Sequence, residues 1–283
     1  MNSAVRRFFQ RLPVLRHGYG SLRKVYHRQR IAHAASGHFV NIDEYRKALR
    51  IEDGKIVDIQ TKNGLIVAIR RNYADAVILA EIFVDNCYVQ GLHLPIHPTV
   101  VDIGGYIGDF ALYAAKYLDA RRVVVCEPSP HNWILLKKNI ARNHYQDRIE
   151  LVNKAVTNGE DVMMNVDVPD RGQAMVTAYG DRKSGGRLIS GVTLASLIEE
   201  YGLNAIDLLK IDCEGGEYPI LSETPSEVLR GIRNIVFEYH EVDGFKSKLK
   251  SVTQRLRDEG FSLTTRGCLI FASRPPGAVN VTF

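Results

Sequence analysis

The stretch VVDIGGYIGDF, residues 100–110, constrains the fold most, because it joins an apolar run to a helical pattern through closely spaced glycines. From residue 99 onward, apolar runs of strand length alternate with segments of helical length. Parallel strands connected by helices are buried on both faces, which accounts for such continuous apolar runs. The pattern predicts an α/β fold with a doubly wound, mostly parallel sheet. The strand candidates are TVVDIG, RVVVCEP, RIELVNKAV, IDLLKID and RNIVFEYH, and a hairpin of FSLTT and CLIFAS closes the chain.

Charge is distributed unevenly along the 283 residues, whose net charge is +5. The first 30 residues hold eight Lys and Arg and no acid, which leaves 29 basic and 32 acidic residues in the rest. Apolar residues recur between these arginines at loosely helical spacing. We expect helices that pack on the domain or form a homodimer contact, with weak binding to a membrane surface as the alternative.

Location and redox state follow from what the sequence lacks. No apolar run approaches the roughly 20 residues of a membrane-spanning helix, and the N-terminus has no signal-peptide pattern. The four cysteines lie far apart, so free thiols are expected. These features favour a cytoplasmic protein.

Changes in pattern divide the chain into three expected parts. An Asn-Gly pair at 63–64 between alternating apolar residues predicts a β-hairpin. The spacing over 74–88 predicts a helix. The parts are a basic helical N-terminal extension (1–47), a β-hairpin and helix leading into the core (48–98), and an α/β domain (99–283) with a turn-rich insertion at 157–192.

The glycine loop has the spacing D-x-G-x-x-x-G, from Asp102 through Gly104 to Gly108. A dinucleotide fingerprint requires G-x-G-x-x-G, so the loop suits S-adenosylmethionine better than a pyrophosphate. Glycines let the backbone approach the ligand closely, and Asp102 is placed to accept from its amino acid moiety. Glu127, at the end of the next strand, is expected to hold the ribose diol. The expected cofactor-binding set is Asp102, Gly104, Gly105, Tyr106, Gly108, Glu127, Pro128, Ser129, Asn153 and Asp212.

Five stretches of the sequence together carry a resemblance to a known family: DIGGYIGDF, EPSPHNWILLKKNIARN, TLASL, LLKIDCEGGEYPIL and YADAVILAEIFVDNCYV. On these motifs the chain resembles the FkbM family of S-adenosylmethionine-dependent methyltransferases over roughly residues 64–272. The resemblance implies a class I (Rossmann-like) methyltransferase fold, a seven-stranded sheet whose last strand is antiparallel. The sequence departs from the family at Gly105-Tyr106, where Ala-Asn is more common, and at Ala195, where Asp is usual.

Acidic residues and a histidine follow the fourth and fifth strands of the core. Because ligands bind outside the carboxyl ends of such strands, Asp212, Glu214, Glu238 and His240 are expected to surround the transferred methyl group. An alcohol acceptor needs a base; His240 is the first candidate, with Asp212 or Glu214 next. Alternatively, Asp212, Glu238 and His240 could ligate a divalent metal, although nothing in the spacing demands one.

Two charged residues near this cluster have structural interpretations. Glu217 is expected in the first turn of a helix, where a negative side chain complements the helix dipole. Lys210 is expected to pair with an acid.

Three functions are compatible with these observations. The first is O-methylation of a hydroxyl on a small or medium acceptor, such as a sugar, polyketide, other natural product or glycoconjugate, a class that the resemblance implies. The second is an RNA methyltransferase recruited by the basic arm. No Asn/Asp-Pro-Pro-aromatic motif follows the fourth strand, so no nucleic acid is expected. The third is a non-catalytic membrane-surface protein with a vestigial cofactor fold, against which the intact glycine loop and Glu127 argue.

Overall fold

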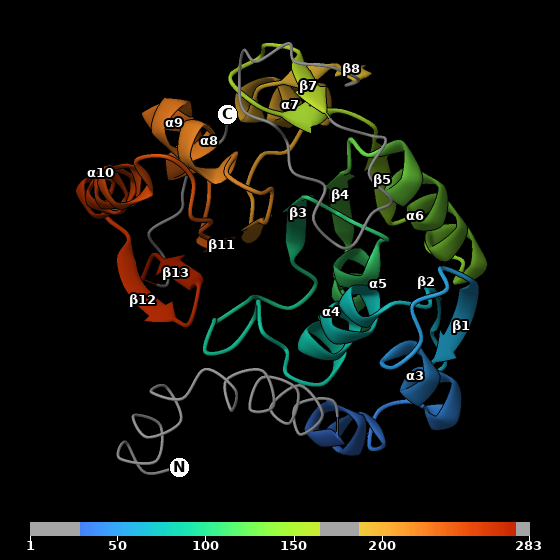
Figure 1. The fold of residues 1–283 in the computed structure, drawn as a ribbon. Helices are drawn as coiled ribbons and strands as arrows, with labels where there is room; N and C mark the ends of the chain where they lie inside the picture. The colour runs from blue at the N-terminus through green and yellow to red at the C-terminus, as the bar shows by residue number, and fades with distance from the viewer. Residues whose placement is uncertain (1–28, 165–186, 276–283) are drawn as a thin grey trace, which may run out of the picture.

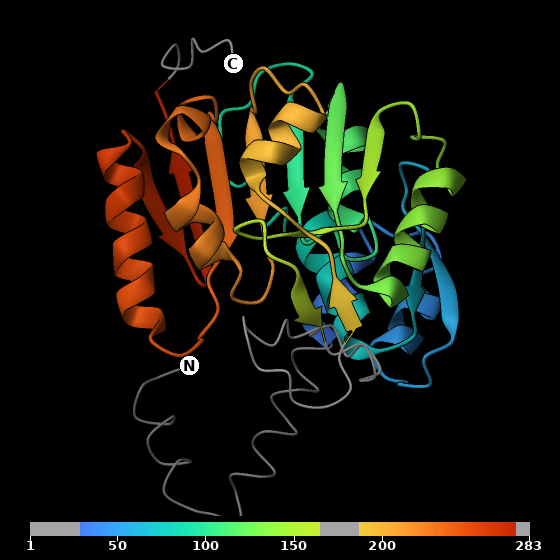
Figure 2. The same ribbon diagram turned by 90° about the horizontal axis from the view of Figure 1, so that it is seen from above.

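The protein is described by a computed structural model that covers residues 29–164 and 187–275. Its centre is a seven-stranded sheet (Figure 2). The strands lie in the order β12 (Ser262–Arg266), β13 (Leu269–Ser273), β11 (Asn234–Glu238), β10 (Leu208–Ile211), β3 (Thr99–Ile103), β4 (Arg122–Cys126) and β5 (Ile149–Val152). β13 is antiparallel to both neighbours, and the other pairings are parallel. The expected doubly wound sheet with an antiparallel last strand is confirmed.

Helices cover both faces of the sheet (Figure 1). Alternation along the central strands divides the core between these faces: Val100 belongs to one hydrophobic cluster and Val101 to the other. On one face lie α3 (Ile42–Ala48), α4 (Tyr73–Phe83), α5 (Asp109–Tyr117) and α6 (Pro130–Arg142), and on the other lie α7 (Leu194–Glu200), α8 (Glu217–Glu223), α9 (Ser226–Arg230) and α10 (Phe245–Asp258).

Local signals place the helix ends well, with one exception. Ser129 is the N-cap of α6 and Pro130 is its first residue, as expected. Proline suits this position because it lacks an N–H, and a main-chain N–H there would have no acceptor within the helix. α10 ends just before Gly260, also as expected. α9 was not expected from the sequence, because five residues are too few to show a helical period.

The predicted hairpin consists of β1 (Ile56–Gln60) and β2 (Ile66–Arg70), joined by a five-residue loop in which Gly64 has a φ of +90°. The free edge of β2 is covered by α6. The Asn139 amide bonds both the N–H and the C=O of Ala68, at 2.8 and 3.0 Å, and also donates to the carbonyl of Ile107 at 2.8 Å. This buried amide therefore ties the hairpin to the glycine loop.

Short strands form two small additional sheets in and beside the turn-rich region. β6 (Ala155–Val156) pairs in parallel with β9 (Gly191–Val192), and β7 (Val162–Met164) pairs antiparallel with β8 (Arg187–Ile189). The strand expected at QAMVTAY lies outside the described residues, as does most of the basic extension. Within residues 29–164 and 187–275, no helix is long and apolar enough to cross a membrane.

Candidate active site

The glycine loop runs from the end of β3 to the start of α5. Gly104 and Gly108 have φ angles of +82° and +83°, which favour glycine. A Cβ on Gly104 would lie 1.7 Å from the main-chain oxygen of Asp212, and one on Gly105 would lie 2.1 Å from a methyl of Val125. Close packing against Asp212 and Val125 therefore requires glycine at these positions. Packing within the protein thus adds a requirement for glycine to the close ligand approach that the sequence predicts.

Asp102 and Lys210 form a buried ion pair at the centre of the sheet. The two side chains are 0% and 4% exposed, and Lys210 Nζ lies 2.9 Å from Asp102 Oδ1 and 3.0 Å from the Gly104 carbonyl oxygen. Burial opposes the charge on Lys210, but the carboxylates of Asp102 and Asp212 raise its pKa overall, so the lysine is charged. The acid partner expected for Lys210 is thus Asp102, whose second oxygen, Oδ2, has no hydrogen-bond partner in the described chain.

Glu127 follows β4 and is almost completely buried. Its carboxylate accepts hydrogen bonds from the main-chain N–H groups of Tyr106 and Ser129, both at 2.8 Å, and from the Asn132 amide at 3.4 Å. These donors fix the carboxylate beside the glycine loop, where it borders a cavity with Pro128.

This cavity, of about 110 Å³, lies outside the ends of β3, β4 and β10, and we call it the donor cavity. Of the expected cofactor set, Gly104, Tyr106, Glu127, Pro128 and Asp212 line it. Asp102, Gly105, Gly108, Ser129 and Asn153 do not. Asn153 is exposed and donates to the main-chain oxygen of Glu127 at 2.8 Å. The remaining lining residues are Ile78, Ile82, Tyr88, Asp109, Asn132, Lys210, Cys213 and Glu214.

Asp109 is a lining residue that the sequence reasoning missed. It is 2% exposed, and its Oδ2 has no hydrogen-bond partner within the described residues. Burial raises its pKa to about 7, against the opposing charge of Lys210. Its position directly after Gly108 in the glycine motif was the available signal.

The segment before the core supports the same loop through Asp75, which is fully buried. The Tyr106 hydroxyl donates to Asp75 Oδ1 at 2.6 Å, and Arg70 Nε donates to Oδ2 at 3.0 Å. Arg70 also donates to the side-chain oxygen of Asn132 at 2.9 Å, and Asn132 contacts Glu127. The departure from the family at Tyr106 therefore has a structural role: it joins the loop to α4 and β2.

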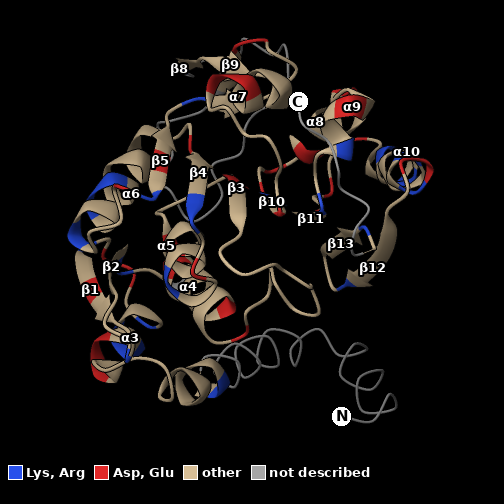
Figure 3. Ribbon diagram, turned by 180° about the vertical axis from the view of Figure 1, so that it is seen from behind, with Lys and Arg blue, Asp and Glu red and all other residues tan. Residues whose placement is uncertain are grey.

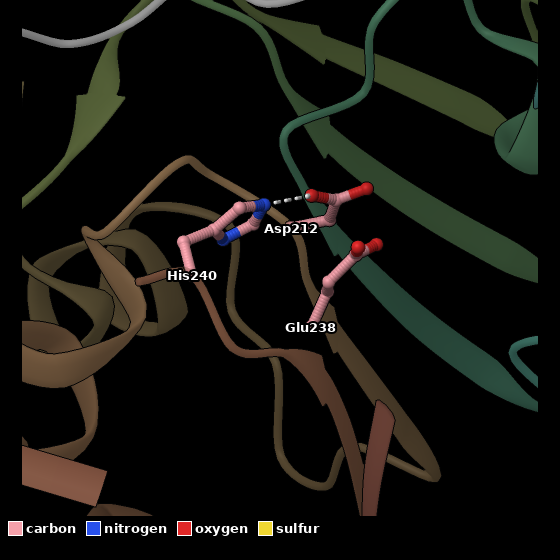
Figure 4. A group of neighbouring side chains, drawn as sticks. All are labelled: Asp212, Glu238 and His240. Carbon is pink, nitrogen blue, oxygen red and sulfur yellow. Dashed lines mark ion pairs between the residues drawn. The ribbon is translucent and has the colours of Figure 1, made fainter. Parts of the chain in front are cut away.

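Acidic residues, red in Figure 3, lie where β10 and β11 end. There the expected residues do converge: Asp212, Glu238 and His240 offer ligand atoms that all lie within 4.8 Å of one another (Figure 4). His240 Nε2 is 3.7 Å from Asp212 Oδ1 and 3.7 Å from Glu214 Oε2. The Tyr88 hydroxyl donates to Asp212 Oδ2 at 2.6 Å, a contact without any sequence signal.

Glu217 has a larger role than the sequence suggested. It begins α8, as expected, and is fully buried. Its Oε1 accepts from the main-chain N–H of His240 at 2.8 Å and lies 3.3 Å from His240 Nδ1, while its Oε2 accepts from Gly215 N–H at 2.7 Å. Burial lowers the pKa of His240, but the Glu217 hydrogen bond and the charges of Glu217, Glu214 and Asp212 raise it to about 9. Glu217 thus orients the imidazole with Nε2 toward the acids.

Comparisons with known proteins identify the family of the chain. Residues 102–263 match the Methyltransferase FkbM domain family. The chain is 30% identical to the 31-O-demethyl-FK506 methyltransferase FkbM of Streptomyces tacrolimicus, over 76% of this chain and 92% of that protein. It is 28% identical to methyltransferase sdnD of Sordaria araneosa, over 66% and 82%.

A solved structure of an FkbM methyltransferase from Methylobacillus flagellatus KT matches with a TM-score of 0.46 and 16% identity, covering 64% of this chain and 45% of that one. The family match spans more than half of the 283 residues and contains the glycine loop, Glu127 and the acidic cluster. The chain therefore belongs to the FkbM family of S-adenosylmethionine-dependent methyltransferases.

Proposed function

We propose that this methyltransferase transfers the methyl group of S-adenosylmethionine to a hydroxyl oxygen of a small or medium acceptor, with His240 as the base. The observation that carries the proposal is the placement of His240. Buried Glu217 fixes one ring nitrogen, and the other faces Asp212 and Glu214, which line the donor cavity. A base oriented by a carboxylate and placed beside a methyl donor suits deprotonation of an alcohol.

The residues around the donor cavity fit the chemistry of S-adenosylmethionine. Glu127 offers a carboxylate to a ribose diol. Asp109 lines the cavity and retains a buried carboxylate oxygen without a described hydrogen-bond partner, which suits the ammonium group. When bound, S-adenosylmethionine supplies a methyl group on a positively charged sulfur, and the electrons of the C–S bond remain on the sulfur. A second small cavity, of about 40 Å³, shares Gly104, Pro128 and Cys213 with the donor cavity and has apolar walls that suit the faces of an adenine ring.

His240 takes the proton of the acceptor hydroxyl in this proposal, so the imidazole must first be neutral. With a pKa of about 9 the free protein holds it largely as imidazolium at neutral pH. The imidazolium loses its proton more readily when additional positive charge occupies the neighbouring cavity, because like charges disfavour the protonated form. Asp212 and Glu214 then stabilise the imidazolium that forms again as the acceptor is deprotonated.

A divalent cation at Asp212, Glu238 and His240 is the competing arrangement, and it would lower the pKa of the acceptor hydroxyl. The bond from Glu217 to Nδ1 leaves Nε2 available for either role. Treatment with EDTA distinguishes the base mechanism from the metal arrangement. The base mechanism predicts that methyl transfer persists, whereas the metal arrangement predicts loss that Mg²⁺ restores.

The acceptor class rests on the relative from Streptomyces tacrolimicus, whose name states that it methylates 31-O-demethyl-FK506. We therefore propose a hydroxylated natural product, sugar or glycoconjugate. A panel of such compounds, assayed by release of S-adenosylhomocysteine, identifies the acceptor.

His240→Asn should retain S-adenosylmethionine binding, measured by calorimetry, and lose transfer, while His93→Asn at an exposed position serves as the matched control. Wild-type protein that fails to bind S-adenosylmethionine, or full transfer by His240→Asn, would refute the proposal.

A further inference from the structure

A further cavity, larger than the donor cavity, lies between α8 and α10, and we call it the α8–α10 cavity. Its volume is about 410 Å³, which is within the usual range of about 300–1,000 Å³ for small-molecule sites. No pattern in the sequence indicates this cavity. Its lining residues are Asn158, Glu214, Gly215, Gly216, Tyr218, Pro219, Ser222, Glu223, Val242, Lys248, Ser251 and Val252.

Glu214 joins this cavity to the donor cavity, because it lines both. Its φ of +52° is left-handed, which is uncommon for a residue other than glycine and concentrates at functional sites. Its carboxylate lies 3.7 Å from His240 Nε2. The Glu214 side chain therefore borders the donor cavity, the proposed base and the α8–α10 cavity.

The walls of the α8–α10 cavity have a consistent chemical character. Buried Tyr218 and Val252 line its interior, with half-buried Pro219 and Val242 beside them. The exposed residues that line it are polar: Ser222, Glu223, Lys248 and Ser251. An apolar interior with hydroxyl groups and charges of both signs at its exposed part suits an amphipathic molecule that carries hydroxyls and little net charge.

We infer that the α8–α10 cavity holds the body of the methyl acceptor, a hydroxylated small molecule with an apolar portion. The reacting hydroxyl reaches His240 past Glu214. This inference rests on the proposed O-methyl transfer and adds the location and chemical class of the acceptor. It predicts that residues of α8 and α10 control acceptor affinity without affecting the methyl donor.

The test uses n-octyl β-D-glucoside, which combines sugar hydroxyls with an apolar tail, at concentrations below micelle formation. Its dissociation constant is measured by NMR titration of the full chain. Ser251→Trp fills the cavity from α10, and Ser222→Trp fills it from α8; both positions are exposed, so the fold tolerates the change. Lys250→Trp places the same side chain on an adjacent exposed position of α10 that does not line the cavity.

We expect wild type and Lys250→Trp to bind the glucoside equally, and the two serine variants to bind it at least about tenfold more weakly, because indole occupies the space. S-adenosylmethionine affinity, measured by calorimetry, should be the same in all four proteins. Wild-type protein that does not bind the glucoside, or serine variants that bind it as wild type does, would overturn the inference while leaving the proposed transfer standing. Loss of donor binding in wild type would instead overturn the proposed function.

Discussion

Replacing Lys210 by methionine tests whether its ion pair with Asp102 stabilises the donor cavity. Nζ lies 2.9 Å from the carboxylate and also donates to the Gly104 carbonyl, so one ammonium group joins β10 to the glycine loop. It lies 4.9 Å from the Tyr88 ring centroid and 5.7 Å from that of Phe110. Methionine retains the apolar length between these rings but removes the charge and all its donors. The variant leaves a fully buried carboxylate without its counter-charge.

The expected loss of unfolding free energy follows from the burial of the ion pair. Removing one partner of a buried pair costs about 3–5 kcal/mol, a large share of the roughly 5–15 kcal/mol that stabilises a typical domain. The double variant Asp102→Asn/Lys210→Met removes both charges, and we expect it to be more stable than the sum of the two single variants by at least about 2 kcal/mol. Its S-adenosylmethionine affinity should remain low, because the ammonium group that joins β10 to the glycine loop is still absent.

Urea unfolding followed by circular dichroism measures the unfolding free energies, and calorimetry measures donor binding. Arg122→Met is the matched control, because the Arg122–Glu150 pair is 33% and 38% exposed and should contribute less than about 1 kcal/mol. A Lys210→Met cost no larger than this control, or strictly additive costs in the double variant, would refute the reasoning.

Three further predictions concern single side chains. Glu217→Gln removes the charge of one of the three acids that raise the pKa of His240, with Glu214 and Asp212 unchanged. The NMR titration midpoint of that imidazole should therefore fall below about 9; an unchanged midpoint contradicts the assigned contact. Tyr106→Phe removes the hydroxyl that donates to Asp75 Oδ1, while Arg70 still donates to the same carboxylate. The loss should cost about 1–3 kcal/mol in urea unfolding and weaken donor binding; unchanged binding would show that the hydroxyl does not position the loop. The pKa of Asp109 is about 7 in the folded chain and 3.8 in the unfolded chain. Between these pH values the native state therefore binds more protons than the unfolded state, and the unfolding free energy falls as the pH rises. Asp109→Asn should remove that contribution, and an identical pH dependence of urea unfolding in the variant would contradict it.

The sheet and the convergence of the acidic cluster could be predicted because both depend on strand order. Apolar runs separated by helices fix a doubly wound topology, and neighbouring parallel strands end at the same edge. Asp212 follows β10, and Glu238 ends β11, which pairs with it in parallel. Their proximity, and that of His240 two residues on, therefore follows from position along each strand.

Contacts between elements could not be predicted in the same way. Tyr88 and Asp212 are 124 residues apart, and Tyr106 and Asp75 are 31 apart. No periodicity connects such pairs, because they depend on how α4 and its flanking loop pack against the sheet. Glu217 also makes a contact that no sequence pattern predicts, although it lies nearer to His240 in the sequence than the members of these pairs lie to each other. Its place in the first turn of α8 followed from the glycine pair before it, but its bond to His240 required the end of β11 to lie beside that turn.

The glycine loop shows why a sequence motif does not identify ligand contacts by itself. A side chain at Gly104 would collide with the Asp212 carbonyl at 1.7 Å even without a ligand. A Gly104→Ala variant would therefore displace Asp212, together with its contacts to Tyr88 and His240, and loss of activity would follow whether or not the glycine touches the methyl donor. Glu127 is a better probe of donor binding, since its carboxylate borders the donor cavity and its replacement by Gln preserves shape. Substitutions in the glycine motif therefore test first how β3 and β10 pack, whereas substitutions of the residues around it test ligand binding.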